Sequence, residues 1–171
     1  TGELDPNDPV LKCRDRNELL AALLRQKGSK TAAAKGLKDW ADHVGVSAPE
    51  RKWDDFKGVE LRGKIGLVLI NDPDFEAGPG DAVSGRFGGN AATYYARWTY
   101  KYEEAARRGA IAALIVHETP GAGYGWSTAV APGGEGFDVV RADPARDKVL
   151  LQAWLHRDTA VAIFGKAGLD F

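Results

Sequence analysis

The sequence contains no methionine and only one cysteine, Cys13, among its 171 residues. A single cysteine excludes an internal disulfide and any redox motif built from two cysteines of one chain. We interpret Cys13 as an ordinary thiol without a catalytic role. Because a complete gene product normally begins with methionine, the missing residue favours a processed product, an excised domain or an engineered fragment. We therefore expect that part of the chemistry lies on residues of a neighbouring domain.

A strong charge of one sign and a long apolar run are also missing. Lysine and arginine number 23 against 24 acidic residues, which gives a formal net charge of −1. No global field therefore favours nucleic acid or an anionic membrane surface. No apolar run approaches the ~20 residues of a membrane-spanning helix, and the start, TGELDPNDP, lacks the basic and apolar regions of a secretory signal. We expect no nucleic-acid partner and no membrane insertion.

Motifs for metal binding, nucleophilic catalysis and phosphate binding are absent from the sequence. The three histidines, His43, His117 and His156, include no His-x-x-x-His spacing that would present two imidazoles to zinc from one helical face. Ser84 and Ser127 lack the Gly-x-Ser-x-Gly pattern of a nucleophile elbow, and no glycine loop contains Gly-Lys-Ser or Gly-Lys-Thr. We interpret His117 as a strand-end histidine with a local hydrogen bond. The sequence predicts no catalytic residue, no metal site and no cofactor in this chain.

The most informative stretch that is present runs from Thr93 to Glu118. Its first half predicts a helix with an aromatic stripe and with a charged outer face, and its second half, after Gly109, predicts a strand that is buried on both faces. We interpret the stripe as packing core. The aromatic residues are Tyr94, Tyr95, Trp98 and Tyr102, and the outer face carries Glu103, Glu104, Arg107 and Arg108.

Turn residues divide the rest of the chain into further elements. Helices are predicted over 15–27 and about 30–43, and a last helix is predicted with Asp158 as its cap. Strands are predicted over 65–70, 137–141 and 149–156, and glycine-rich loops over 76–92 and 119–136. The turn after the first of these strands explains Asn71-Asp72-Pro73-Asp74 without a bound cation. This order predicts a mixed α/β domain in which two apolar strands are joined through a helix, in a right-handed crossover.

Four blocks in order resemble the protease-associated domain that zinc peptidases of the M28 family carry as an insert. The resemblance covers about residues 45–170, and each block is weak by itself. The blocks are Gly45–Glu50 with Trp53–Val59, Leu61–Ile65 through Asn71-Asp72-Pro73, the helix and strand of 93–118 continuing to Tyr124–Ser127, and Trp154 with Ala167-Gly168-Leu169.

The resemblance implies a fold, a location and a partner. The fold would be a single swivelling β/β/α domain, with a mixed sheet or open barrel and flanking helices, over residues 45–171. Residues 1–44 would be a helical N-terminal segment, which departs from the family pattern. The family's two zinc ions belong to the peptidase domain, so no zinc ligand transfers to this chain, and export to the periplasm or the extracellular space is expected.

Three hypotheses for function follow. The first is a non-catalytic module that shapes substrate access to a peptidase or docks a protein, through contacts of the two glycine loops with the peptidase domain or a peptide substrate. Its candidate contact residues are Arg86, Phe87, Tyr95, Arg97, Tyr124 and Trp126. The second is a small hydrolase that uses Asp54, Asp55 or Asp74 with His117. The third is self-association through the helices of 15–43, whose apolar residues are Leu19, Leu20, Leu23, Leu24 and Trp40.

Overall fold

The computed structural model of the protein describes residues 44–131, 137–143, 145–168 and 171, all of which belong to one compact unit, Asp42–Phe171. The helices predicted over 15–27 and 30–43, and with them the domain boundary near residue 44, lie outside the described residues. Within the part that the structure describes, no helix combines the length and the apolarity that crossing a bilayer requires.

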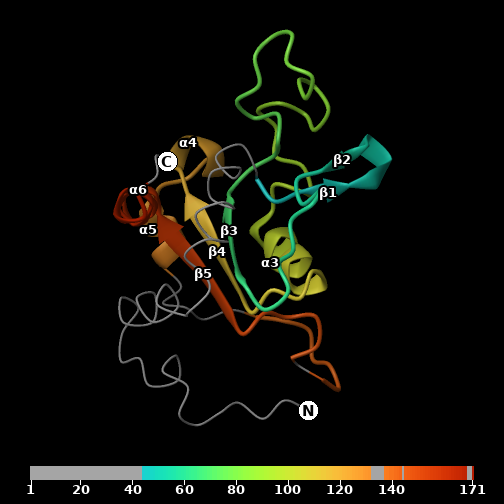
Figure 1. Ribbon diagram of the computed structural model, residues 1–171, viewed down its shortest axis with the longest axis vertical. Coiled ribbons are helices and arrows are strands. Elements are labelled where there is room, and N and C mark those ends of the chain that lie inside the picture. The colour runs from blue at the N-terminus through green and yellow to red at the C-terminus, as the bar shows by residue number, and fades with distance from the viewer. Residues whose placement is uncertain (1–43, 132–136, 144, 169–170) are drawn as a thin grey trace. The chain divides into compact units, whose positions relative to one another are not determined.

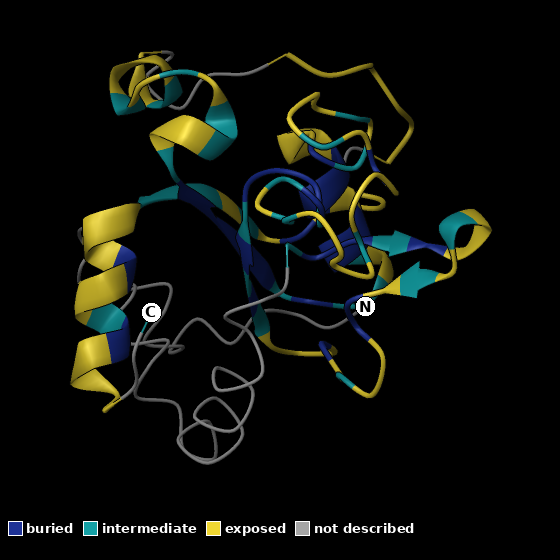
Figure 2. Ribbon diagram, turned by 90° about the horizontal axis from the view of Figure 1, so that it is seen from above, coloured by how far each residue is buried: buried dark blue, intermediate teal, exposed yellow. Residues whose placement is uncertain are grey.

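A parallel three-stranded sheet in the order β3-β4-β5 forms the centre of the domain (Figure 1). The strands are β3 (Ile65–Leu69), β4 (Ala112–His117) and β5 (Leu151–His156). Every residue of β4 is buried, as its uncharged apolar run predicts, and the sheet at the centre of Figure 2 contains dark blue, the colour of buried residues. The prediction of a mixed α/β domain is confirmed, and the two strands that flank the long helix are parallel.

A short antiparallel hairpin precedes the sheet. It consists of β1 (Ser47–Ala48), the 3-10 turn η1 (Pro49–Arg51) and β2 (Trp53–Asp54). Val46 and Ala48 at its base form a core cluster with Phe87 and Tyr100, which come from the first glycine loop and from the long helix. The hairpin, the loop and the helix are therefore packed together.

The helix α3 (Trp98–Arg107) begins four residues after Tyr94, where the aromatic stripe begins. Tyr94 and Tyr95 lie in the preceding turn, and Tyr94 and Trp98 are 54% and 48% exposed. The prediction that the stripe is packing core therefore holds for Tyr102 and in part for Tyr95, which packs against the core cluster, and is wrong for Tyr94 and Trp98. The buried side of α3 carries Tyr100, Lys101, Tyr102, Glu104 and Ala105, so the assignment of Glu104 to the outer face is also corrected.

The elements after β4 differ from the prediction at three points. The second glycine loop contains two short helices, α4 (Thr119–Ala122) and α5 (Trp126–Val130). Residues 137–141 form no strand, and their side chains are exposed. The last helix, α6 (Arg157–Lys166), is capped by His156, whose side chain accepts a hydrogen bond from the backbone N–H of Asp158. Helix α6 buries Ala160 and Phe164 and leaves its outer side exposed (Figure 2).

Candidate functional site

The first glycine loop is held in place by one buried carboxylate. Oδ2 of Asp74 accepts hydrogen bonds from three consecutive backbone N–H groups, those of Phe87, Gly88 and Gly89, at 2.8, 3.1 and 3.1 Å. The two glycines have φ angles of 116° and 59°, in the left-handed region that favours glycine and lets successive N–H groups converge on one acceptor. Asp74 is only 2% exposed. Its carboxylate therefore acts as a fixed anchor for the loop.

A second buried carboxylate anchors the turn before α3. Asp72 accepts hydrogen bonds from the backbone N–H and the hydroxyl of Thr93, at 2.7 and 2.8 Å. The hydroxyl oxygen of Thr93 in turn accepts from the N–H of Tyr95. Asp72 lies just beyond β3, so this contact connects the end of that strand to the start of α3.

Lys101 joins three segments from a buried position on α3. It is 1% exposed, and its Nζ donates to the backbone carbonyls of Val44 and Asn71, at 2.6 and 2.8 Å. Burial lowers the pKa of Lys101 to about 7, although the nearby carboxylates of Asp55 and Asp72 act in the opposite direction. The entry to the hairpin, the end of β3 and α3 are thus connected through one ammonium group.

The carboxylates of the hydrolase hypothesis accept hydrogen bonds from the hairpin, from the end of α3 and from the first glycine loop. Asp55 accepts from the N–H of Val46 and from the indole of Trp53, at 2.8 and 2.6 Å. Asp54 accepts from Arg108 at 3.1 Å. Asp54 and Asp74 form no bond with His117 in the described part of the chain. Among the described residues, the close pair with His117 that the hydrolase hypothesis needs is therefore not formed by Asp54 or by Asp74.

Four of the six predicted contact residues come from the first glycine loop and the turn before α3. Arg86 and Arg97 are exposed and Tyr95 is half-buried, with its hydroxyl donating to Glu50 at 2.5 Å. Phe87 is 1% exposed, and its ring packs edge-on against the ring of Tyr95. Phe87 therefore packs beneath the exposed side chains and is not itself accessible to a partner. The guanidinium of Arg51 lies over both rings, 5.0 Å from Phe87 and 5.6 Å from Tyr95.

The other two predicted contact residues, Tyr124 and Trp126, pack around a buried histidine. The His117 ring is 5.4 Å from Tyr124, 5.6 Å from Trp126 and 5.8 Å from Trp154. Trp126 also lies 5.1 Å from the ring of His156. His117 is at the end of its strand, as predicted, and is 2% exposed; its Nε2 has no hydrogen-bond partner among the described residues.

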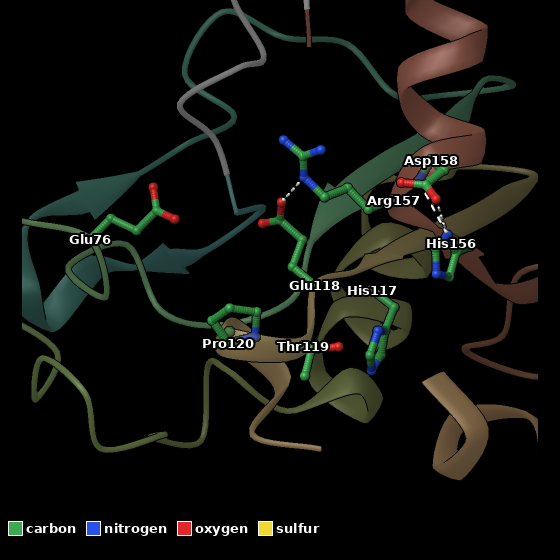
Figure 3. A pocket seen from close by; sticks show the side chains of 9 residues that line it. Glu76, His117, Glu118, Thr119, Pro120, His156, Arg157 and Asp158 are labelled. Carbon is green, nitrogen blue, oxygen red and sulfur yellow. Dashed lines mark hydrogen bonds and ion pairs between the residues drawn. The ribbon is translucent and has the colours of Figure 1, made fainter. Parts of the chain in front are cut away.

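A pocket of about 340 Å³ lies at the carboxyl ends of β4 and β5 (Figure 3). His117 and His156 are register partners at the last positions of these strands, and both line it. The pocket also contains carboxylates of the residues that follow the two strands. Glu118 forms an ion pair with Arg157 at 2.8 Å, and Oδ2 of Asp158 lies 3.7 Å from Nδ1 of His156.

The sequence does not predict this grouping, because its residues follow two strands that are distant in the chain and form no motif of fixed spacing. One signal could have found it. The carboxyl ends of adjacent parallel strands meet at one edge of a sheet, and this edge is where ligands bind in open α/β sheets. The two predicted strands that end at His117 and His156 therefore place their polar ends together if they are neighbours.

Comparisons with protein-family models, with curated proteins and with solved structures find no significant match for this chain. Among the described residues, no group of three or more histidine, cysteine, aspartate or glutamate side chains is arranged to hold a metal ion.

Proposed function

We propose that the described part of this chain is a non-catalytic domain of the protease-associated type, which shapes substrate access to an M28-type zinc peptidase domain or docks a protein to it. The four sequence blocks support the family assignment. The central block corresponds to the unit α3-β4, in which Gly109, with a φ of 75°, joins helix and strand. Under this proposal the zinc ions belong to the peptidase domain, and the protein is exported.

The observation that carries the proposal is the use of the buried charged side chains. Asp55, Asp72, Asp74 and Lys101 are all nearly inaccessible, and all bond to the backbone of a loop or a turn. Burying a charge is unfavourable unless the charge is paired and hydrogen-bonded. These side chains are therefore stable in the interior only while the loops and turns keep the shape that supplies their hydrogen bonds. A loop and a turn that are fixed and carry the exposed side chains of Arg86, Tyr94 and Arg97 are suited to contact another protein.

The proposal predicts which surface meets the peptidase domain. A photo-crosslinking benzoylphenylalanine in place of Arg97 should label an M28-type peptidase sequence, identified by mass spectrometry of the crosslinked peptides. The same group in place of Gln152, which is exposed on β5, provides the matched control. Equal labelling from the two positions would contradict the assigned contact surface.

A second experiment tests the absence of catalysis directly. The purified chain should show no zinc-dependent hydrolysis of aminoacyl-nitroanilide substrates. Turnover that needs zinc and is abolished by a chelator would overturn the non-catalytic assignment. Self-association through residues 15–43 concerns residues outside those described and is tested by the mass in solution after deletion of residues 1–44, because an unchanged oligomeric state argues against it.

A further inference from the structure

The surface formed by the first glycine loop and the turn before α3 carries two arginine side chains without a charge partner. Arg86 and Arg97 are exposed, and neither guanidinium forms an ion pair or a hydrogen bond with another described residue. Apart from Arg62, the other arginines of the described residues are paired with carboxylates. The paired arginines are Arg51, Arg107, Arg108, Arg141, Arg146 and Arg157. Two guanidinium groups therefore remain available to a partner at this surface.

The carboxylates of the same segments are bonded to other groups. Glu50 accepts from the hydroxyl of Tyr95 and lies 3.4 Å from the guanidinium of Arg51. Three aspartates of these segments accept hydrogen bonds from backbone N–H groups, and the first turn of α3 contains no acidic residue. These aspartates are Asp72, Asp74 and Asp81. Carboxylates that fix the backbone of this surface thus leave its two arginines unpaired among the described residues.

The backbones of the two arginines are fixed and are joined to each other. The carbonyl of Arg86 accepts from the guanidinium of Arg51, and the N–H of the residue after Arg86 donates to Asp74 at 2.8 Å. The same guanidinium of Arg51 lies 5.6 Å from the ring of Tyr95, two residues before Arg97, which is the N-cap residue of α3. A partner therefore meets both cations on a preformed backbone, which lowers the entropic cost of binding.

We propose that this surface docks an acidic segment of the partner protein, whose carboxylates bind the guanidinium groups of Arg86 and Arg97. A guanidinium presents a planar fork of N–H donors that matches a carboxylate through two parallel hydrogen bonds. The inference rests on the proposed function, so the acidic segment belongs to the peptidase domain. Because both arginines are exposed, each contact contributes about threefold in affinity and is weakened by salt. The charges therefore select the partner and speed its association more than they tighten the complex.

The test is a titration of the full chain with two blocked peptides at low salt, followed by the Nε–H signals of the arginines in NMR spectra. Acetyl-Gly-Glu-Ser-Glu-Gly-amide carries two carboxylates, and acetyl-Gly-Gln-Ser-Gln-Gly-amide is its neutral isostere. We expect saturable shifts of the Arg86 and Arg97 signals with the acidic peptide, and affinity for the neutral peptide that is weaker by about threefold or more. Added salt should reduce this difference. An equal response to the two peptides would overturn the proposal.

Two variants connect the binding to the named side chains. Arg86→Gln and Arg97→Gln alter exposed side chains, and each should weaken the affinity for the acidic peptide about threefold. Arg62→Gln is the matched control, because Arg62 is also exposed and unpaired among the described residues but precedes β3, whereas the anchors of the surface follow that strand. Equal losses in the three variants would refute the assigned site.

The outcomes separate this inference from the proposed function. Crosslinking to a peptidase sequence together with equal binding of the two peptides would overturn the acidic docking alone. Preferential binding of the acidic peptide, without any crosslink to a peptidase sequence, would support the acidic preference and overturn the peptidase domain as its source.

Discussion

Removing the carboxylate of Asp74 should release the first glycine loop and destabilise the domain. In Asp74→Ala, three backbone N–H groups lose their acceptor, and one of them, that of Phe87, is buried. An unsatisfied buried donor costs about 1–3 kcal/mol, while the two partly buried donors can recover water and add about 0.5 kcal/mol each. Oδ1 of Asp74 is itself buried without a described partner, so its removal offsets part of the loss. We expect a decrease of about 2 kcal/mol in the free energy of unfolding, a large share of the roughly 5–15 kcal/mol of a typical domain.

The assay is urea denaturation followed by tryptophan fluorescence, together with limited proteolysis of the loop 76–92. Asp81→Ala is the matched control, because Asp81 accepts one bond from the N–H of Gly78 at an exposed position. It should cost less than about 0.5 kcal/mol. Asp74→Asn keeps one acceptor oxygen and should fall between the two. The anchoring role of Asp74 would be refuted if Asp74→Ala and Asp81→Ala had equal stabilities and equal rates of loop cleavage.

Three further predictions concern α3 and the ends of helices. Burial lowers the pKa of Lys101 from 10.5 to about 7, so the folded protein binds fewer protons than the unfolded chain between these values. The free energy of unfolding should therefore rise with pH across this window relative to that of Lys101→Met, by at most about 1.4 kcal/mol per pH unit. Urea denaturation at several pH values measures it, and the same pH dependence in both proteins would contradict the prediction. Tyr100→Phe removes a hydroxyl that bonds to both the N–H and the carbonyl of Ser47 in β1. Urea denaturation should show a loss of about 1–2 kcal/mol in the free energy of unfolding, against less than about 0.5 kcal/mol for Tyr94→Phe, which removes an exposed hydroxyl. Gly109→Ala forces alanine to a φ of 75°, which should lower the free energy of unfolding by about 1–2 kcal/mol and lower the thermal midpoint. Gly165→Ala, inside α6, should raise the thermal midpoint. Equal changes of the thermal midpoint in the two variants would refute the special role of Gly109.

The central strand and its joint could be predicted from local sequence because their causes are local. The uncharged run of β4 requires burial on both faces, and Gly109 is the residue type that a left-handed helix end favours. These two signals also led to the parallel pairing with β3, because a helix between two buried strands is the usual crossover.

The helix start that the aromatic stripe predicts is wrong, because a contact between distant segments sets the actual start of α3. Counting i, i+4 and i+8 from Tyr94 assumes that the helix has already begun there. Asp72 instead bonds to Thr93 and holds the next residues in a turn, so α3 starts at Trp98 and turns a different side toward the core. Lys101 is buried because its acceptor carbonyls come from Val44 and Asn71, which no spacing within the helix reveals.

Contacts between distant segments also explain why the candidate site could not be predicted from the sequence. His117 and His156 become neighbours only through the register of β4 and β5. Tyr124 and Trp126 were selected as loop aromatics that touch a partner, and in the structure they also enclose His117. Motifs with fixed spacing describe sites that lie within one element, whereas this pocket is formed by the ends of two strands.

The central claim is that buried charge fixes the first glycine loop as a rigid contact surface. Amide hydrogen exchange of Phe87, Gly88 and Gly89, followed by NMR, tests it most directly, because the three N–H groups that bond to Asp74 are observed themselves. The account predicts protection of these amides that approaches that of β4 and that is lost in Asp74→Ala. Exchange at the rate of an open loop in the unmodified protein would contradict it.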